Sequence, residues 1–572
     1  MLQIKDLTIT HKKDLRTIVE KFSFVLNAGD RAVMIGEEGN GKSTILKWIY
    51  SPGAIESYAE AEGSCIHTGE KLGYLPQELE IEERGKSVCE FFAEEESFWE
   101  YDRKELNGLA RQLYFSPELF YSEQRMGTLS GGEKVKVQMA RILMGRPTIL
   151  LLDEPSNDID IETLEWLETF IRESELPILY VSHDETLIER TANMVIHLEQ
   201  LRRKTLCRCT VAHMPYREYL EQREAGMEKQ EREALNDRRQ EKIRQEKLHR
   251  IMEKVDRDQA NISRQDPAGG RLLKKKMKSV KSMERRFDRE AEDMTRMPEA
   301  EEAIFLKFGQ DIRIPAGKVI LDFHCDRLTA GKKAEKYDRE TSRGGGENGS
   351  PGEGFRGNGS GSPEVSFGEK GKENSVESLE ETEREMSESA KKVLAEQIEL
   401  YVKGAEKICI TGRNGAGKTT LLRRIAAQLL TREDIHAAYM PQNYEELLDM
   451  SRTPVEYLCT TGGKEEVTRI RTYLGSMKYT ADEMNHPTAE LSGGQKAKVF
   501  LLKMSLSEAD VLILDEPTRN FSPLSNPVIR NVLRAYGGTI ISVSHDRKYI
   551  REVCDTVYEL TPQGLILRKN IL

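Results

Sequence analysis

The sequence predicts an α/β protein in which one domain design occurs twice, with a long α-helical hairpin between the copies. Three observations carry this prediction. Five short motifs recur in the same order in both halves of the 572-residue chain. Two runs of aliphatic residues end in an Asp-Glu pair, as buried parallel strands do. The middle of the chain is rich in Glu, Arg, Lys and Gln, with one Pro-Gly interruption.

The composition narrows the class of protein. Hydrophobic residues make up 38% of the chain and charged residues 32%, which suits buried cores together with long solvated helices. No stretch approaches the roughly 20 apolar residues of a membrane span, and the start MLQIKDLTIT does not resemble a secretion signal. Of the eight cysteines only Cys207 and Cys209 are close together, and C-x-C is not a zinc spacing. We therefore expect reduced thiols and a cytoplasmic protein.

The five repeated motifs predict two homologous domains. In the first and second copy they are GEEGNGKST at 36–44 and GRNGAGKTT at 412–420, YLPQ at 74–77 and YMPQ at 439–442, LSGG at 129–132 and 491–494, ILLLDEP at 149–155 and VLILDEP at 511–517, and YVSHD at 180–184 and SVSHD at 542–546. Chance does not produce five motifs in one order twice. We assign the domains to residues 1–212 and 300–572.

Residues 213–299 form the predicted hairpin linker. A first helix is expected from Tyr216 to about Ile262, and the interruption at 263–272 carries Pro267, Gly269 and Gly270, which break helices. The basic residues near this tip are Arg264, Arg271, Lys274, Lys275, Lys276, Lys278, Lys281, Arg285 and Arg286. Against them stand only Asp266 and Glu284, so nine minus two gives +7 in a chain of net charge −11. Such a focused patch suits a nucleic-acid backbone, although a solvated spacer is the plain alternative.

A second irregular stretch lies inside the second domain. Residues 331–389 are rich in Gly, Ser and Glu and poor in apolar residues, so they are expected to be a disordered insertion. The insertion separates VILDFHCDRL from LAEQIELYV, two expected strands. We assign it no function.

The repeated motifs carry phosphate chemistry. In G-x-x-x-x-G-K-[ST], glycines let backbone N–H groups close around phosphates at a helix N-terminus. Lys42 and Lys418 would reach the β and γ phosphates of ATP, and Ser43 and Thr419 would ligate Mg²⁺. Asp153 and Asp515 end the two buried strands, and each can hold Mg²⁺ directly or through water. The next residues, Glu154 and Glu516, can polarise water for attack on the γ-phosphate.

Phosphate loop, Gln loop, LSGG, DEP and SHD in this order resemble the nucleotide-binding domain of ABC ATPases, over most of both halves. The resemblance implies two domains facing head to tail, with each ATP held between one phosphate loop and the opposite LSGG. It implies that Gln77 and Gln442 serve both in catalysis and as Mg²⁺ ligands, and that His183 and His545 contact the γ-phosphate. The nucleotide-binding residues it implies for the first site are Gly36, Gly39, Asn40, Gly41, Lys42, Ser43 and Thr44, closed by Ser492, Gly493 and Gly494. Those implied for the second site are Gly412, Asn414, Gly415, Ala416, Gly417, Lys418, Thr419 and Thr420, closed by Ser130, Gly131 and Gly132.

Two features depart from a symmetric pair of sites. Ser522 stands in the second half where Asp160 stands in the first, so the sites are expected to differ in coupling or rate. Both keep their glutamate, which predicts that both hydrolyse ATP. The aromatic residue that would stack on adenine is not evident, and His11 is one candidate in the first half.

Among ABC ATPases, tandem domains joined by a charged helical linker of about 80 residues resemble the ABC-F family, as does YREYLEQR at 216–223. Transporters need membrane spans, which a separate subunit could supply. Chromosome-maintenance ATPases separate the phosphate loop from LSGG by long coiled coils, and excision-repair ATPases insert zinc modules. ABC-F membership implies that the linker tip contacts 23S-type ribosomal RNA and tRNA in the exit and peptidyl-site region. It also implies a monomer whose two domains pair with each other.

Within ABC-F, TRNFSPLSNPVIR at 518–530 resembles the antibiotic-resistance branch. Gln77 and Ser130 are 53 positions apart and Gln442 and Ser492 are 50 apart, so the first domain has no room for an extra arm. This branch displaces lincosamides, pleuromutilins and streptogramins A from the peptidyl-transferase centre. A housekeeping factor acting on stalled ribosomes and the ATPase subunit of an exporter remain as alternatives.

Overall fold

The computed structural model describes residues 1–67, 69–201, 204–260, 267–292, 294–298, 314–329 and 393–568. Two features predicted from the sequence lie outside these residues, namely the insertion at 331–389 and the basic side chain of Arg264.

A six-stranded sheet forms the centre of the first half. Its strands are β3 (Arg31–Ile35), β5 (Leu72–Leu75), β6 (Ile149–Asp153), β7 (Ile178–Val181), β8 (Met194–Leu201) and β9 (Leu206–Ala212). They lie in the order β5-β6-β7-β3-β8-β9, and all neighbours are parallel except β8 and β9. Every residue of β6 is buried, as the aliphatic run before Asp153 predicts.

The second half repeats this sheet. Its strands are β12 (Lys407–Thr411), β13 (Ala437–Met440), β14 (Val511–Asp515), β15 (Thr539–Val543), β16 (Thr556–Thr561) and β17 (Gly564–Arg568). The order β13-β14-β15-β12-β16-β17 matches the first sheet strand for strand, with the last pair antiparallel. The predicted α/β fold class, with one design used twice, is confirmed.

Smaller antiparallel sheets accompany both halves. In the first half, β1 (Leu2–His11) lies between β2 (Thr17–Leu26) and β4 (Ala59–Ile66). In the second half, β10 (Val319–Thr329) pairs with β11 (Val393–Lys403), so the two strands expected on either side of the insertion are neighbours.

Three kinds of helix position the repeated motifs. The phosphate loops lead into α1 (Lys42–Tyr50) and α11 (Lys418–Leu430), and LSGG leads into α5 (Gly131–Met144) and α15 (Gly493–Leu506). The DEP and SHD motifs precede α6 (Ile161–Glu173), α7 (Glu185–Thr191), α16 (Asn526–Ala535) and α17 (Arg547–Val553). The remaining helices of the two halves are α2 (Ile81–Arg84), α3 (Val88–Ala93), α4 (Arg103–Gln112), α12 (Pro454–Leu458), α13 (Lys464–Ser476) and α14 (Ala481–Asn485).

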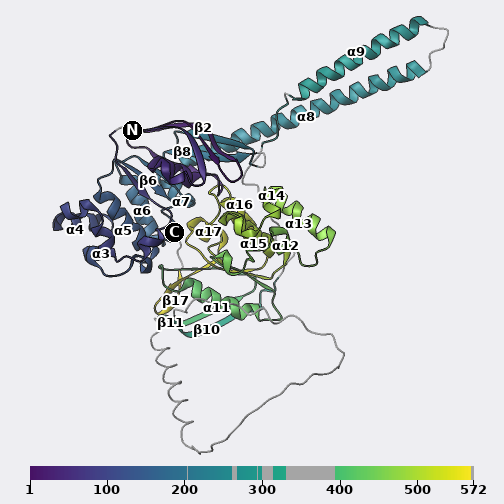
Figure 1. Ribbon diagram of the computed structural model, residues 1–572. Coiled ribbons are helices and arrows are strands. Elements are labelled where there is room, and N and C mark those ends of the chain that lie inside the picture. The colour runs from purple at the N-terminus through teal and green to yellow at the C-terminus, as the bar shows by residue number, and fades with distance from the viewer. Residues whose placement is uncertain are drawn as a thin grey trace, which may run out of the picture.

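The linker is a two-helix hairpin that projects from the body of the molecule (Figure 1). It consists of α8 (Tyr216–Ala260) and α9 (Pro267–Glu292), and α8 alone is roughly 70 Å long at about 1.5 Å per residue. Pro267, expected to break the helix, is instead the first residue of α9, where its fixed φ suits a helix start and no hydrogen bond is lost.

Apolar side chains spaced by heptads hold the two hairpin helices together. Leu248 and Val255 of α8, seven residues apart, are buried, and so is Val280 of α9. Met277 and Phe287 on the same side of α9 are half-buried. Among the described residues, no helix has the length and apolar character needed to cross a membrane.

The two halves are joined by a polar interface between α6 and α7 on one side and α16 and α17 on the other. The Arg530 guanidinium donates two hydrogen bonds to the Glu185 carboxylate, at 2.6 and 3.1 Å, with both side chains only 4% exposed. Lys548 donates to the same carboxylate at 3.0 Å, and Arg547 pairs with Glu168. Leu524 packs into the core of the first half and Ile161 into that of the second, so each half lends an apolar side chain to the other.

Candidate active sites

Both phosphate loops join a buried strand to a helix. At Gly36, φ is 146°, and a Cβ would lie 2.3 Å from the Leu198 carbonyl oxygen, so the position requires glycine. The Lys42 ammonium donates to the carbonyl oxygens of Gly36 (2.9 Å) and Glu37 (3.1 Å). Lys418 binds Gly412 and Arg413 in the same way, at 2.8 and 2.9 Å. Each lysine is thus held over its own loop.

The carboxylates expected to ligate Mg²⁺ lie beside the hydroxyls expected to do the same. The Ser43 hydroxyl donates to Asp153 Oδ1 at 2.9 Å, and Tyr74 donates to the other oxygen at 3.3 Å. In the second half Thr419 lies beside Asp515. Both carboxylate oxygens of Asp515 are buried, and among the described residues neither accepts a hydrogen bond of ordinary geometry. Burial raises the pKa of both aspartates to about 6. A cation would restore their charged forms, so the donor sets fit Mg²⁺.

The two Gln-loop residues are placed differently. Gln442 lines the cavity of the second site, and its side chain donates to Asp158 of the opposite half at 3.3 Å. Gln77 is exposed at the end of β5. The candidate adenine-stacking residue His11 lies at the end of β1 and pairs with Asp14 at 2.9 Å.

The glutamate and histidine expected to act on water form a pair in each half, but the two pairs differ in charge. His183 Nε2 is 2.8 Å from Glu154 Oε1, whereas His545 Nε2 is 3.9 Å from Glu516 Oε1. Both glutamates have left-handed backbones, at φ 51° and 52°, which is uncommon for this residue type.

The ionisation of these pairs follows from the distances. Burial alone would raise the pKa of Glu154 and lower that of His183, but the close charges outweigh burial and shift both pKa values the other way. Both shifts favour the ionised form of the first pair. In the second pair burial, together with the Asp515 charge, raises the pKa of Glu516 to about 8. Burial lowers the pKa of His545 to about 3, so this pair is neutral near pH 7.

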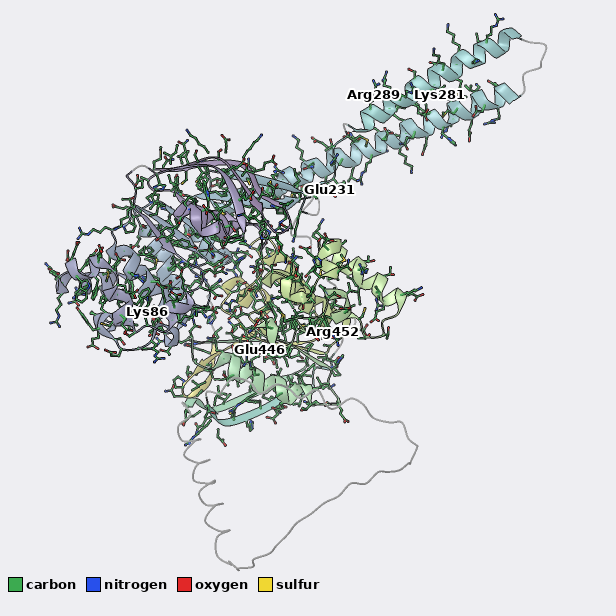
Figure 2. The ribbon with its side chains drawn as sticks, in the orientation of Figure 1. Lys86, Glu231, Lys281, Arg289, Glu446 and Arg452 are labelled. Carbon is green, nitrogen blue, oxygen red and sulfur yellow. The ribbon has the colours of Figure 1, made fainter. Side chains whose placement is uncertain are left out.

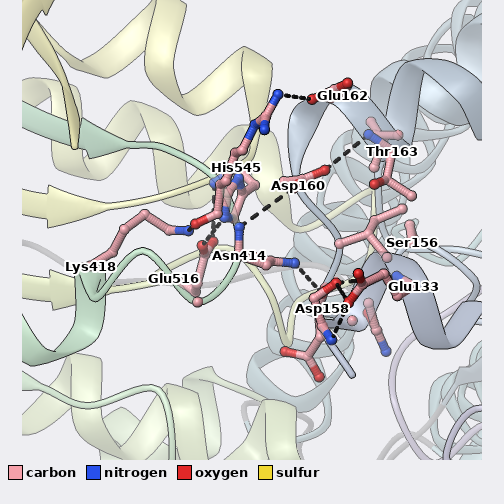
Figure 3. Close-up of a pocket in the computed structure, with 18 of the residues that line it drawn as sticks. Glu133, Ser156, Asp158, Asp160, Glu162, Thr163, Asn414, Lys418, Glu516 and His545 are labelled. Carbon is pink, nitrogen blue, oxygen red and sulfur yellow. Dashed lines mark hydrogen bonds and ion pairs between the residues drawn. The ribbon is translucent and has the colours of Figure 1, made fainter. Parts of the chain in front are cut away.

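The second site is a cavity between the halves, shown in Figure 3. Its volume is about 1190 Å³, and one wall is the second phosphate loop with Lys418 and Thr419. The opposite wall holds Ser130, Gly131 and Gly132, so the structure brings together the two motifs that the resemblance paired. The Asn414 side chain donates to the Asp158 carbonyl, and Arg413 pairs with Glu162 at 3.2 Å (Figure 3).

The first site is crossed by direct bonds between the halves. The Gly494 backbone N–H donates to the Glu38 carboxylate of the first phosphate loop. The neighbouring Glu37 accepts hydrogen bonds from Lys498 at 3.0 Å, Ser522 at 2.8 Å and Ser525. Burial would raise the pKa of Glu37, but the Lys498 charge and the serine hydroxyls outweigh it and lower the pKa to about 2.

Sequence reasoning missed the residues that join the halves around the first loop. Glu37, Glu38 and Lys498 were not singled out, although GEE in place of the GRN of the second copy was a visible signal. Ser522 was noted as a departure, and its contact with Glu37 gives that departure a physical reason. Asp158 was also missed; besides Gln442, it contacts Arg519 at 2.8 Å.

Eight of the nine basic residues expected to contact nucleic acid are described, and all eight are exposed on α9. They are Arg271, Lys274, Lys275, Lys276, Lys278, Lys281, Arg285 and Arg286. Figure 2 labels Lys281, together with the nearby Arg289, on the part of the hairpin that stands away from both domains.

Comparisons with known proteins agree with this geometry. A family model described as ABC transporter matches residues 19–157 and 395–519. The uncharacterized ABC transporter ATP-binding protein YfmM of Bacillus subtilis is 25% identical, over 97% of this chain and 97% of its own. ABC transporter F family member 5 of Arabidopsis thaliana is 23% identical, over 95% of this chain and 73% of its own.

One solved structure resembles the whole chain in fold. It belongs to the complex of archaeal ribosomal stalk protein aP1 and archaeal ribosome recycling factor aABCE1. The TM-score is 0.52 at 17% identity, covering 97% of this chain and 87% of that chain. The two halves thus have the fold of ABC-type P-loop ATPase domains, arranged in tandem.

Proposed function

We propose that this chain, which carries two ABC-type ATPase domains in tandem, is a ribosome-associated ATPase of the ABC-F type. The observation that carries the proposal is the long hairpin with an exposed basic helix, projecting from the two contacting domains (Figures 1 and 2). The similarity to an F family member supports it, as does the fold shared with the complex that contains the archaeal ribosome recycling factor aABCE1.

The reaction is ATP hydrolysis at two composite sites. Glu154 and Glu516 each accept a proton from the attacking water, and His183 and His545 contact the γ-phosphate. Lys42 and Lys418 hold the β and γ phosphates. Ser43 with Asp153, and Thr419 with Asp515, would hold Mg²⁺, with Gln77 and Gln442 completing the two sets, and the bound ion would neutralise phosphate charge. The glycines of LSGG close each nucleotide from the opposite half.

The hairpin is the part that meets the ribosome. Eight described basic side chains on one exposed helix attract phosphate groups, and a chain of negative net charge has little other attraction for RNA. We assign them to ribosomal RNA and to tRNA near the peptidyl-transferase centre.

A short chain of contacts links the first phosphate loop to the hairpin. The Asn40 amide donates to the Leu198 carbonyl of β8 at 3.0 Å, and the adjacent His197 lies 2.7 Å from the Tyr219 hydroxyl of α8. Arg223 of α8 also donates to Glu199 of β8 at 3.0 Å. A change at the first phosphate loop thus acts on the base of the hairpin, whose first helix is roughly 70 Å long.

The finer proposal is displacement of lincosamide, pleuromutilin or streptogramin A antibiotics. ATP favours the closed pair and fixes the direction of the hairpin, whose tip then reshapes the drug site; hydrolysis reopens the pair. A housekeeping role on stalled ribosomes is the alternative that fits the same structure. An exporter ATPase subunit would bind a membrane protein and ignore ribosomes.

Co-sedimentation with ribosomes tests the proposal. With ATP, Glu154→Gln/Glu516→Gln should remain on ribosomes several-fold more than the unmodified chain, because hydrolysis no longer releases it. Equal sedimentation would overturn the proposed cycle. Growth inhibition by a lincosamide and a pleuromutilin in a susceptible Gram-positive host then separates the two roles. A several-fold rise in the inhibitory concentration of either drug that needs both glutamates supports drug displacement. An unchanged inhibitory concentration for both drugs supports the housekeeping role.

A further inference from the structure

The first phosphate loop carries a negative charge at the place where the opposite LSGG helix begins. We propose that Glu38 is a tethered anion that occupies the Gly494 amide of the first site and competes with ATP there. The first site would then close without nucleotide and bind ATP more weakly than the second. This inference rests on the proposed ATP binding and goes beyond it by assigning unequal affinities to the two sites.

The geometry places the Glu38 carboxylate against both glycines of the motif. The Gly494 N–H donates to one of its oxygens. A Cβ built on Gly493 would lie 3.2 Å from Glu38 Oε2, and one on Gly494 would lie 3.3 Å from the same atom. These residues open the 14-residue helix α15, whose N-terminus carries partial positive charge. The carboxylate thus takes an anion position that the resemblance gives to the nucleotide.

Glu37 fixes the loop in this position. Its carboxylate accepts hydrogen bonds from Lys498 on α15 and from Ser522 and Ser525 in the turn before α16. The exposed fractions of the Glu37 and Lys498 side chains are 13% and 8%, so the ion pair is largely shielded from water. With Glu37 tied to the opposite half, Glu38 is held next to Gly494 rather than free to turn into solvent.

The second site has the same frame, but its phosphate loop, residues 412–420, carries no carboxylate of its own. Arg413 and Asn414 replace Glu37 and Glu38, and their side chains contact Glu162 and the Asp158 carbonyl. Both contacts lie beside the LSGG turn, and Gly131 and Gly132 line the cavity together with Lys418. An amide side chain brings no negative charge to a nucleotide triphosphate, whereas Glu38 repels it and takes one of its donors.

Nucleotide titration of the purified full-length chain tests the inference. In a Lys418→Ala background, which removes the second-site lysine, a fluorescent ATP analogue reports the first site. Glu38→Asn, which copies Asn414, should tighten its binding about tenfold, equivalent to about 1.4 kcal/mol. Glu433→Asn, an exposed glutamate that does not line the cavity, should leave binding unchanged. The melting temperature of each variant establishes that it is folded.

The reciprocal change gives a second reading. In a Lys42→Ala background, Asn414→Glu should weaken binding at the second site about tenfold. Unchanged affinity in both titrations, with folded variants, would overturn the inference while leaving ATP binding intact. If the unmodified chain binds no ATP analogue at either site, the proposed ATPase function fails instead.

Discussion

The Ser522 hydroxyl donates a hydrogen bond of 2.8 Å to Glu37 across the boundary between the two halves. Ser522 is 1% exposed and occupies the position that Asp160 holds in the first half. The two differences between the sites are therefore coupled: an acidic phosphate loop on one side is met by a neutral residue on the other. An aspartate at 522 would face Glu37 within hydrogen-bonding distance, where two carboxylates repel each other strongly.

Ser522→Asp should therefore destabilise the paired state of the halves, by about 3 kcal/mol, because it buries a second carboxylate beside Glu37 with only Lys498 to compensate. Urea unfolding of the full-length chain measures the loss. Adding Glu37→Gln to the same chain restores one carboxylate per lysine, so more than half of the lost stability should be regained. A double variant as unstable as the single one would mean that steric crowding, not charge, causes the effect.

Much of the fold could be predicted from the sequence because its signals are local. The aliphatic runs before Asp153 and Asp515 indicate buried parallel strands, and the charge-rich middle of the chain with its one Pro-Gly interruption indicates a helical hairpin. Pro267 was misjudged because a helix breaker in mid-helix is also a favoured first residue, and local sequence does not distinguish the two.

Less of the site could be predicted, because its contacts join residues far apart in the chain. The resemblance to ABC ATPases implied that LSGG of one half faces the phosphate loop of the other, and Ser130 and Lys418 do line one cavity. It could not indicate that Glu38 meets Gly494, 456 residues away, nor that Glu154 is ionised and Glu516 neutral. Those properties depend on burial and on distances of a few ångströms.

Arg530→Met tests the buried ion pair that joins the halves. The Glu185 carboxylate would lose its two hydrogen bonds from Arg530 and remain buried with Lys548 alone, which should cost about 3 kcal/mol in the free energy of unfolding. Urea denaturation measures the change. Arg232→Met is the matched control, since Arg232 is 80% exposed and pairs with Glu228 on the surface of α8. A loss no larger than that of the control would contradict a structural role for the buried pair.

The pH dependence of hydrolysis should differ between the sites. Glu154→Gln inactivates the first site, so hydrolysis by this variant comes from the second site. The base of that site, Glu516, has a pKa of about 8 because it is buried beside Asp515. Only the ionised carboxylate accepts a proton, and its fraction rises from roughly one tenth at pH 7 to nine tenths at pH 9. The kcat/KM of this variant for ATP, which reports the ionisation of the nucleotide-free site, should therefore rise several-fold over that range.

The reverse variant, Glu516→Gln, inactivates the second site, so its hydrolysis comes from the first site. The pKa of Glu154 is held below its usual value by His183, so its carboxylate is ionised throughout this range and activity should be nearly flat. Phosphate release at ATP concentrations well below KM, measured from pH 6 to 9 for both variants, gives the two profiles. Superimposable profiles would show that the 2.8 and 3.9 Å His–Glu distances do not set the ionisation of the bases.

Neutralising part of the basic face of α9 should weaken ribosome binding in a salt-dependent way. The variant replaces four exposed lysines of α9 with glutamine, namely Lys274, Lys275, Lys276 and Lys278. Each phosphate contact contributes about 0.7 to 0.9 to the slope of log affinity against log salt concentration, so four lost contacts should reduce the slope by about three. The slope is measured by titrating ribosomes with the ATP-trapped Glu154→Gln/Glu516→Gln chain at salt concentrations from about 50 to about 200 mM.

The control replaces the same number of exposed basic residues on the two domains. These are Arg103, Lys104, Lys464 and Arg469. If the hairpin makes the phosphate contacts, the control keeps the slope of the trapped chain and loses little affinity at any salt concentration. If instead both sets reduce the slope equally, attraction comes from the overall charge of the chain, and the basic helix has no privileged contact with RNA. A reduced slope confined to the α9 variant requires that the hairpin itself lies against phosphate.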